Sequence, residues 1–141
     1  MTTRYIALID GRAGAYGVAF PDAPGCTAMG ATVDDALRDA GQALAEWIEQ
    51  AATQDYQPPA PRSADELRRD GEVAEQLSHG AALAVVPLVR ETGRSVRANV
   101  SIDAGLLSAI DDAAEAAGLT RSAFLASAAR AKVLDSVRCG A

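Results

Sequence analysis

A run of polar side chains that alternate with apolar ones offers the clearest chemistry in this sequence. The polar residues are Ser95, Arg97, Asn99 and Ser101. The apolar residues between and beyond them are Val96, Ala98, Val100 and Ile102. Such an alternation predicts a half-buried strand with one polar face. Arginine and asparagine can each bond a base edge in two places, so this face is suited to reading a DNA major groove.

Two helices are expected directly after this strand. Asp103 can cap the first helix, Gly118 can end it, and Thr120 can cap the second. The apolar stripe of the first helix holds Leu106, Ile110, Ala113, Ala114 and Ala117. That of the second holds Phe124, Leu125, Ala128 and Val133. The sequence therefore predicts a strand–helix–helix unit over residues 94–133.

This unit is too small to be stable by itself. Only 48 residues run from Arg94 to the end of the chain, and a chain of that size rarely buries enough apolar surface alone. A lone strand also leaves its backbone N–H and C=O groups unpaired. The strand could join a sheet in the N-terminal half, or it could pair antiparallel with its own copy from a second chain.

Residues 94–133 resemble a ribbon-helix-helix DNA-binding domain. The resemblance rests on the polar alternation, on the acidic cap and on the turn Gly118–Phe124. It implies a homodimer in which the strand residues Arg97, Asn99 and Ser101, with Ser95 on the same face, contact operator DNA. It also implies that the start of the second helix holds phosphate, here at Thr120, Arg121 and Ser122.

Composition narrows the class of protein. Of the 141 residues 49% are hydrophobic, which is typical of a globular chain. No apolar run is long enough for a transmembrane helix, and the start of the chain lacks the layout of a signal peptide. Cys26 and Cys139 lie far apart, and His79 is the only histidine. We therefore expect a cytoplasmic protein with free thiols, no metal and no cofactor.

Charge is divided unevenly along the chain. Residues 1–90 contain 7 arginines and 13 acidic residues, whereas residues 91–141 contain 6 basic and 6 acidic ones. The acidity argues against diffuse nucleic-acid binding by the whole chain, although a few clustered arginines could still read DNA. An acidic first part suits a basic protein partner, but it could equally serve only to keep the protein in solution.

The first 90 residues carry a separate set of signals. Strands are expected over residues 5–9, 16–20 and 26–30, with a rigid loop at Pro21–Cys26. A long helix follows, capped by Thr32. Its apolar stripe holds Val33, Ala36, Leu37, Ala40, Leu44, Trp47, Ile48 and Ala51. These positions keep the helical period throughout, so the helix should cover one face of the sheet.

Shorter elements are expected in the rest of the first 90 residues. Residues 57–61 predict a stiff proline-rich connector, and Ser63 with Glu66 predicts the start of a short helix. The apolar run at residues 81–89 predicts a fourth strand, with its proline near the end or on an edge. The pattern changes at residues 90–93, so we expect two domains, 1–90 and 91–141.

The first domain resembles the HicB family of antitoxins. The resemblance lies in Phe20–Cys26, in the following Gly30-Ala31-Thr32, and in the amphipathic helix. It implies an α+β fold: a small antiparallel sheet with a packed helix, similar to a degraded ribonuclease H, followed by the ribbon-helix-helix domain. It also implies an antitoxin of a type II system that covers the active site of a small, basic, HicA-like toxin that cleaves mRNA. The second domain would dimerise and repress its own operon, and whether dimers form tetramers is left open.

Two other functions are alternatives to an antitoxin. A nuclease would need several carboxylates converging on metal ions, and each acidic residue has an alternative place in a turn, a helix cap or a polar helix face. The candidates were Asp10, Asp22, Asp34, Asp35, Asp39 and Glu46. We therefore expect no catalytic residues. The second alternative is a repressor whose first domain senses a small ligand.

Overall fold

The computed structural model describes residues 3–135, so Cys139 lies outside the described residues. Two compact units are present. One holds the described residues up to Arg90 together with Leu134 and Asp135, and the other is Glu91–Val133. The first unit is an antiparallel sheet with helices and the second contains helices, in agreement with the expected α+β class. No helix in the described part of the chain is long and apolar enough to cross a membrane.

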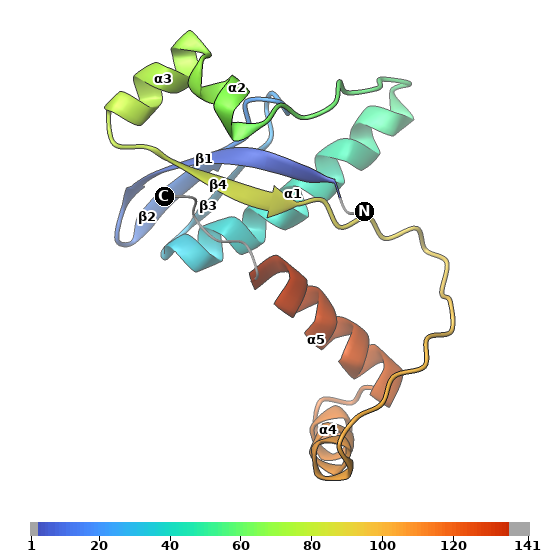
Figure 1. Ribbon diagram of the computed structural model, residues 1–141. Helices are drawn as coiled ribbons and strands as arrows, with labels where there is room; N and C mark the ends of the chain where they lie inside the picture. Colours follow the sequence, from blue (N-terminus) through green and yellow to red (C-terminus); the bar gives the residue numbers. More distant parts are fainter. Residues whose placement is uncertain (1–2, 136–141) are drawn as a thin grey trace. The chain divides into compact units, whose positions relative to one another are not determined.

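A four-stranded antiparallel sheet forms the centre of the first unit (Figure 1). Its strands are β1 (Arg4–Arg12), β2 (Ala15–Ala19), β3 (Thr27–Gly30) and β4 (Ala82–Pro87). The spatial order is β3-β2-β1-β4, so β1 pairs with both the next strand and the last. The four strands predicted in the first 90 residues are confirmed. Pro87 ends an edge strand, where its missing N–H costs no ladder bond.

Helix α1 (Val33–Thr53) covers one face of this sheet. Thr32 caps it as predicted, because its hydroxyl oxygen accepts a hydrogen bond from the Asp35 N–H at 3.1 Å. The buried residues of the helix repeat at the predicted spacing and include Ala40, Leu44 and Ile48. At Gly30 a Cβ atom would lie 2.4 Å from the Ala36 backbone nitrogen, so only glycine lets β3 approach the first turn of α1 this closely.

Two short helices cover the opposite face (Figure 1). Helix α2 (Ala64–Arg68) begins with the predicted capping box between Ser63 and Glu66. Helix α3 (Gly71–Ser78) was not predicted; Asp70 caps it by accepting from two backbone N–H groups. The buried residues on this side of the sheet are Ile6, Leu8, Leu67, Val73 and Leu83. The sheet is thus apolar on both faces and has a helical layer on each.

The second unit contains the two predicted helices, α4 (Ala104–Ala116) and α5 (Arg121–Asp135). Asp103 caps α4 by accepting from two backbone N–H groups, at 2.9 and 3.2 Å. Gly118 follows α4 with φ of +69°, a conformation that glycine adopts without strain. The Thr120 hydroxyl accepts from the Ala123 N–H at 3.1 Å. The three predicted helix-end signals are therefore confirmed.

The predicted strand at residues 94–102 is not formed in the single chain. This segment has no regular secondary structure, and the sheet of the first unit contains only residues between Arg4 and Pro87. The placement of this strand in the N-terminal sheet is therefore wrong. The physical reason is that a strand needs a neighbour for its backbone hydrogen bonds, and a single copy of this chain provides none.

Candidate functional site

Trp47 joins α1 to the loop Pro21–Cys26 that precedes β3. Its ring lies on the apolar side of the helix and is partly buried. The indole Nε1–H donates a hydrogen bond to the carbonyl oxygen of Pro24, at 3.0 Å. A buried tryptophan normally needs such an acceptor for its N–H group, and here the loop provides it. The bond fixes both the loop and the plane of the indole ring.

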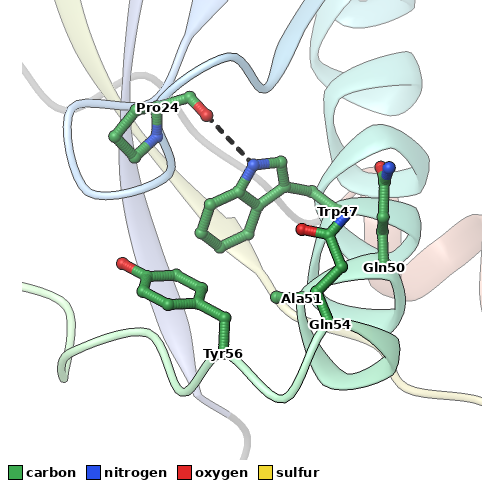
Figure 2. Close-up of a pocket in the computed structure, with 6 residues that line it drawn as sticks. All are labelled: Pro24, Trp47, Gln50, Ala51, Gln54 and Tyr56. Atoms are coloured by element: carbon green, nitrogen blue, oxygen red, sulfur yellow. Dashed lines mark hydrogen bonds between the residues drawn. The ribbon is translucent and has the colours of Figure 1, made fainter.

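Tyr56 stands beside this indole and completes a small pocket (Figure 2). The two ring centroids are 6.3 Å apart with the planes at 90°, an edge-to-face pair. Asp55 adopts φ of +57° after the end of α1, and the Tyr56 N–H then donates to the Ala51 carbonyl at 2.9 Å. The pocket has a volume of about 410 Å³. It is lined by Pro24, Trp47, Gln50, Ala51, Gln54 and Tyr56.

Arg62 holds the same loop through Asp22. The guanidinium Nε lies 2.8 Å from Asp22 Oδ1, and the Arg62 backbone N–H donates to Oδ2 at 2.7 Å. A third bond, from Nη1 to Asp70 Oδ2 at 3.1 Å, connects the loop to the cap of α3. Hydrogen bonds from the Val73 N–H and from Arg62 lower the pKa of Asp70. The Asp22 side chain is only 9% exposed, so Arg62 neutralises a nearly buried carboxylate.

Cys26 ends this loop, and its side chain packs in the core of the first unit. Its side chain is buried, and burial, with a smaller effect from Glu46, raises the pKa of the thiol to about 11. The thiol therefore stays protonated at neutral pH and is a poor nucleophile and metal ligand. Within residues 3–135 no three acidic, histidine or cysteine side chains lie close enough together to hold a metal ion. The six carboxylates considered for a nuclease form no such cluster.

All seven predicted DNA contacts in the second unit are exposed. Four of them, Asn99, Ser101, Arg121 and Ser122, border one hollow of about 560 Å³. Ser95, Arg97 and Thr120 do not border it. The apolar residues of the alternating run that also line this hollow are Ala98, Val100 and Ile102. In a single chain the polar and apolar sets of the predicted strand are therefore not separated onto two faces.

Arg121 also has a partner that the sequence did not reveal. Its guanidinium bonds Asp111 of α4 twice, from Nε to Oδ1 and from Nη2 to Oδ2, both at 2.7 Å. These bonds lower the pKa of Asp111. The pair joins the start of α5 to the middle of α4 and so orients the backbone N–H groups of α5. No spacing rule within one helix could have found it, because the two residues meet only across the turn.

Comparison with known proteins decides the family. Residues 5–129 match the family model described as HicB_like antitoxin of bacterial toxin-antitoxin system. The chain belongs to this family. No curated protein gives a significant match. The predicted resemblance to HicB antitoxins is therefore confirmed, while the ribbon-helix-helix character of the C-terminal unit stays a prediction.

Solved structures give the same family. The antitoxin HicB3 is 28% identical with a TM-score of 0.52, over 93% of this chain and 98% of that one. The antitoxin HicB of Burkholderia pseudomallei is 30% identical over 92% of this chain and 96% of that one, with a TM-score of 0.49. The HicA3 and HicB3 toxin-antitoxin complex matches at 25% identity over 59% of this chain and 94% of that one, with a TM-score of 0.49. Family membership makes this chain an antitoxin.

The Arg62 bonds generate a stability prediction. Arg62→Ala leaves the nearly buried Asp22 carboxylate without its charged partner, so it should lower the free energy of unfolding by about 1–3 kcal/mol. Arg68→Ala is the matched control, because the partner of Arg68 among residues 3–135 is Asp65, whose side chain is 81% exposed. Such a surface pair should contribute about 0–1 kcal/mol. Urea denaturation of the two variants and the wild type measures both values.

The difference in unfolding free energy between the wild type and Arg62→Ala should depend on pH. Because the pKa of Asp70 is lowered in the folded protein, the stability from its ionised form is present at neutral pH and is lost as the pH falls through that lowered pKa. The gap between the wild type and Arg62→Ala should therefore shrink in acid. If Arg62→Ala and Arg68→Ala were equally stable at neutral pH, Arg62 would not hold the loop.

Proposed function

We propose that residues 1–90 of this antitoxin neutralise a small, basic, HicA-like toxin and that residues 91–141 bind operator DNA as a homodimer. The observation that carries the proposal is the family match over residues 5–129, which spans most of both parts. An antitoxin of such a system needs a surface for its toxin. The acidic balance of residues 1–90 gives complementary charge to a basic protein and speeds their encounter.

The exposed apolar side chains of the second unit support a dimer. Val96 and Val100 are 78% and 70% exposed, and Leu106 is 57% exposed. No residue of α5, all of which is described, is buried, and in this unit only Ile110 and Ala114 are. A second copy would provide the missing neighbour for residues 94–102, and it would cover these side chains in a shared core.

A symmetric pair of strands would also produce a DNA-reading surface. When residues 94–102 become a strand, the period of two puts Arg97, Asn99 and Ser101 on the face opposite the valines. A two-stranded ribbon fits the major groove, and Arg97 can bond guanine while Asn99 bonds adenine. The capped start of α5, at Thr120 and Ser122, would hold a backbone phosphate.

The alternative is a repressor whose first domain binds a small ligand in the Trp47–Tyr56 pocket. In this alternative residues 91–141 still bind DNA, and a small ligand replaces the toxin as the partner of residues 1–90. Co-expression with the neighbouring reading frame separates the two functions. An antitoxin should retain a small basic protein through purification, whereas a ligand sensor should not.

Separable domains are the first expectation from this proposal. A fragment of residues 1–90 contains the complete sheet and both of its helical layers, so it should fold and bind the toxin without binding DNA. Circular dichroism and a gel-shift assay with operator DNA test this. An unfolded fragment, or one that shifts the operator unaided, would contradict the domain division.

Dimerisation gives a second expectation. Phe124→Ala should destabilise the fragment 91–141 by about 3–5 kcal/mol, the usual cost for a buried phenylalanine. Because pairing and folding are coupled, the melting temperature should rise with protein concentration. Ser127→Ala, at an exposed position of α5, is the control and should melt like the wild type. A wild-type fragment that melts identically across a hundredfold range of concentration would rule out the dimer.

Base reading gives a third expectation. Arg97→Ala should weaken operator binding at least tenfold, since one bidentate contact is worth about 1–3 kcal/mol and a dimer repeats it in both half-sites. Toxin neutralisation should persist, because the toxin surface lies in the other domain. Cells with this variant should survive the toxin yet lose repression of their own promoter. Operator affinity unchanged in the folded triple variant Arg97→Ala/Asn99→Ala/Ser101→Ala would show that this segment is not in the groove.

A further inference from the structure

The pocket between Trp47 and Tyr56 is preformed on the surface of the antitoxin's first unit. The bond to Pro24 holds the indole ring, and the turn at Asp55, with the Tyr56 N–H bond to Ala51, places the backbone of Tyr56. Figure 2 shows both rings bordering the hollow, with the end of α1 beside them. Tyr56 remains 50% exposed although it is a large aromatic side chain. A rigid aromatic pair with open ring surface is typical of a site that binds another group.

Charge around the pocket specifies which group fits. No lysine, arginine or histidine lines the pocket, and the charged residues directly next to its lining residues in the chain, Glu46, Glu49 and Asp55, are all acidic. The pocket lies at the C-terminal end of α1, where the helix dipole is negative, and the last turn of α1 has no basic residue. The side-chain oxygens of Gln50 and Gln54 add hydrogen-bond acceptors to the lining. The acidic neighbours and the end of the helix dipole favour a cation, and the glutamine oxygens can accept hydrogen bonds from its N–H groups.

We propose that this pocket binds a cationic side chain, with arginine the best fit, that projects from the antitoxin's basic protein partner. A cation over the face of tryptophan or tyrosine is attracted by the ring electrons. Arginine fits best because its planar guanidinium can stack on one ring while its N–H groups reach the two glutamines. This inference rests on the proposed toxin-binding function and places part of the toxin surface at α1 and Tyr56.

The chain provides its own reporter for this test. Trp47 is the only tryptophan in the sequence, so a single indole N–H signal in a ¹⁵N NMR spectrum reports directly on the pocket. Tyr56→Leu removes the second ring and keeps the site apolar, and Tyr56→Phe keeps the ring as a matched control. Because Tyr56 is half exposed, both variants should fold like the wild type.

The first experiment does not use the toxin. N-acetyl-arginine amide is titrated into the full-length protein at constant ionic strength, with the neutral isostere N-acetyl-citrulline amide in parallel. The Trp47 indole signal should move in a saturable way with the arginine compound only. The shift should survive in Tyr56→Phe and disappear in Tyr56→Leu. Equal shifts with both compounds, or a shift that persists in Tyr56→Leu, would overturn the proposed cation site.

The second experiment uses the small basic protein that co-purifies from co-expression. Tyr56→Leu should weaken its binding by about tenfold, since a desolvated cation–π contact is worth that much, whereas Tyr56→Phe should bind like the wild type. Unchanged affinity of Tyr56→Leu would remove the pocket from the interface while leaving the antitoxin function intact. If the arginine titration succeeds but no basic protein is retained, the toxin-binding proposal fails and with it the assignment of the cation to that partner.

Discussion

The need of every strand for a hydrogen-bonded neighbour distinguishes the two units of this antitoxin. The first unit meets this need within one chain, and the second does not. In the first unit each strand has a neighbour, and the order β3-β2-β1-β4 leaves only a four-residue strand and a strand ending in proline at the edges. Helical layers then cover both faces of the sheet. In the second unit residues 94–102 have the alternation of a strand but no neighbour, and their valines stay exposed. The first unit buries its own sheet under two helical layers, whereas the second leaves apolar side chains such as Val96 and Val100 exposed.

The loop Pro21–Cys26 connects the fold of the first unit to its surface chemistry. Arg62 bonds it on one side and Trp47 on the other, so the loop cannot move without breaking a charged pair or exposing the indole N–H. The same two contacts place the indole ring at the pocket and bring the segment after α1 back toward α3. Structural stability and the shape of the pocket thus depend on the same few bonds.

Charge is distributed in keeping with two different partners. The acidic residues of the first domain repel nucleic acid and attract a basic protein, whereas the balanced second domain exposes its few arginines without a surplus of negative charge. Arg121 shows that not every exposed arginine is available for DNA, because Asp111 holds its guanidinium by two hydrogen bonds. In the DNA-binding dimer that we propose, base contacts would therefore come from residues 94–102 rather than from that arginine.

The amino-acid sequence by itself determined the features that depend on short-range patterns. Alternation and helical period located the four strands, α1, α4 and α5, and the caps at Thr32, Ser63 and Asp103 followed from residue type and spacing. The HicB-like loop could be recognised as well, because all residues of its motif, Pro21–Cys26, are contiguous in the sequence. Helix α3 was missed because it is only eight residues long and carries few apolar side chains, although Asp70 before Gly71 is a cap signal.

Tertiary structure alone decided which distant residues meet. The bonds from Arg62 to Asp22 and from Trp47 to Pro24 join positions 40 and 23 residues apart, and the bond from Arg121 to Asp111 crosses a turn. None of these partners is fixed by local spacing, because each depends on how the elements pack. The strand at residues 94–102 shows the converse case. Its sequence carries the pattern of a strand, but a pattern cannot provide the neighbouring backbone that a strand requires.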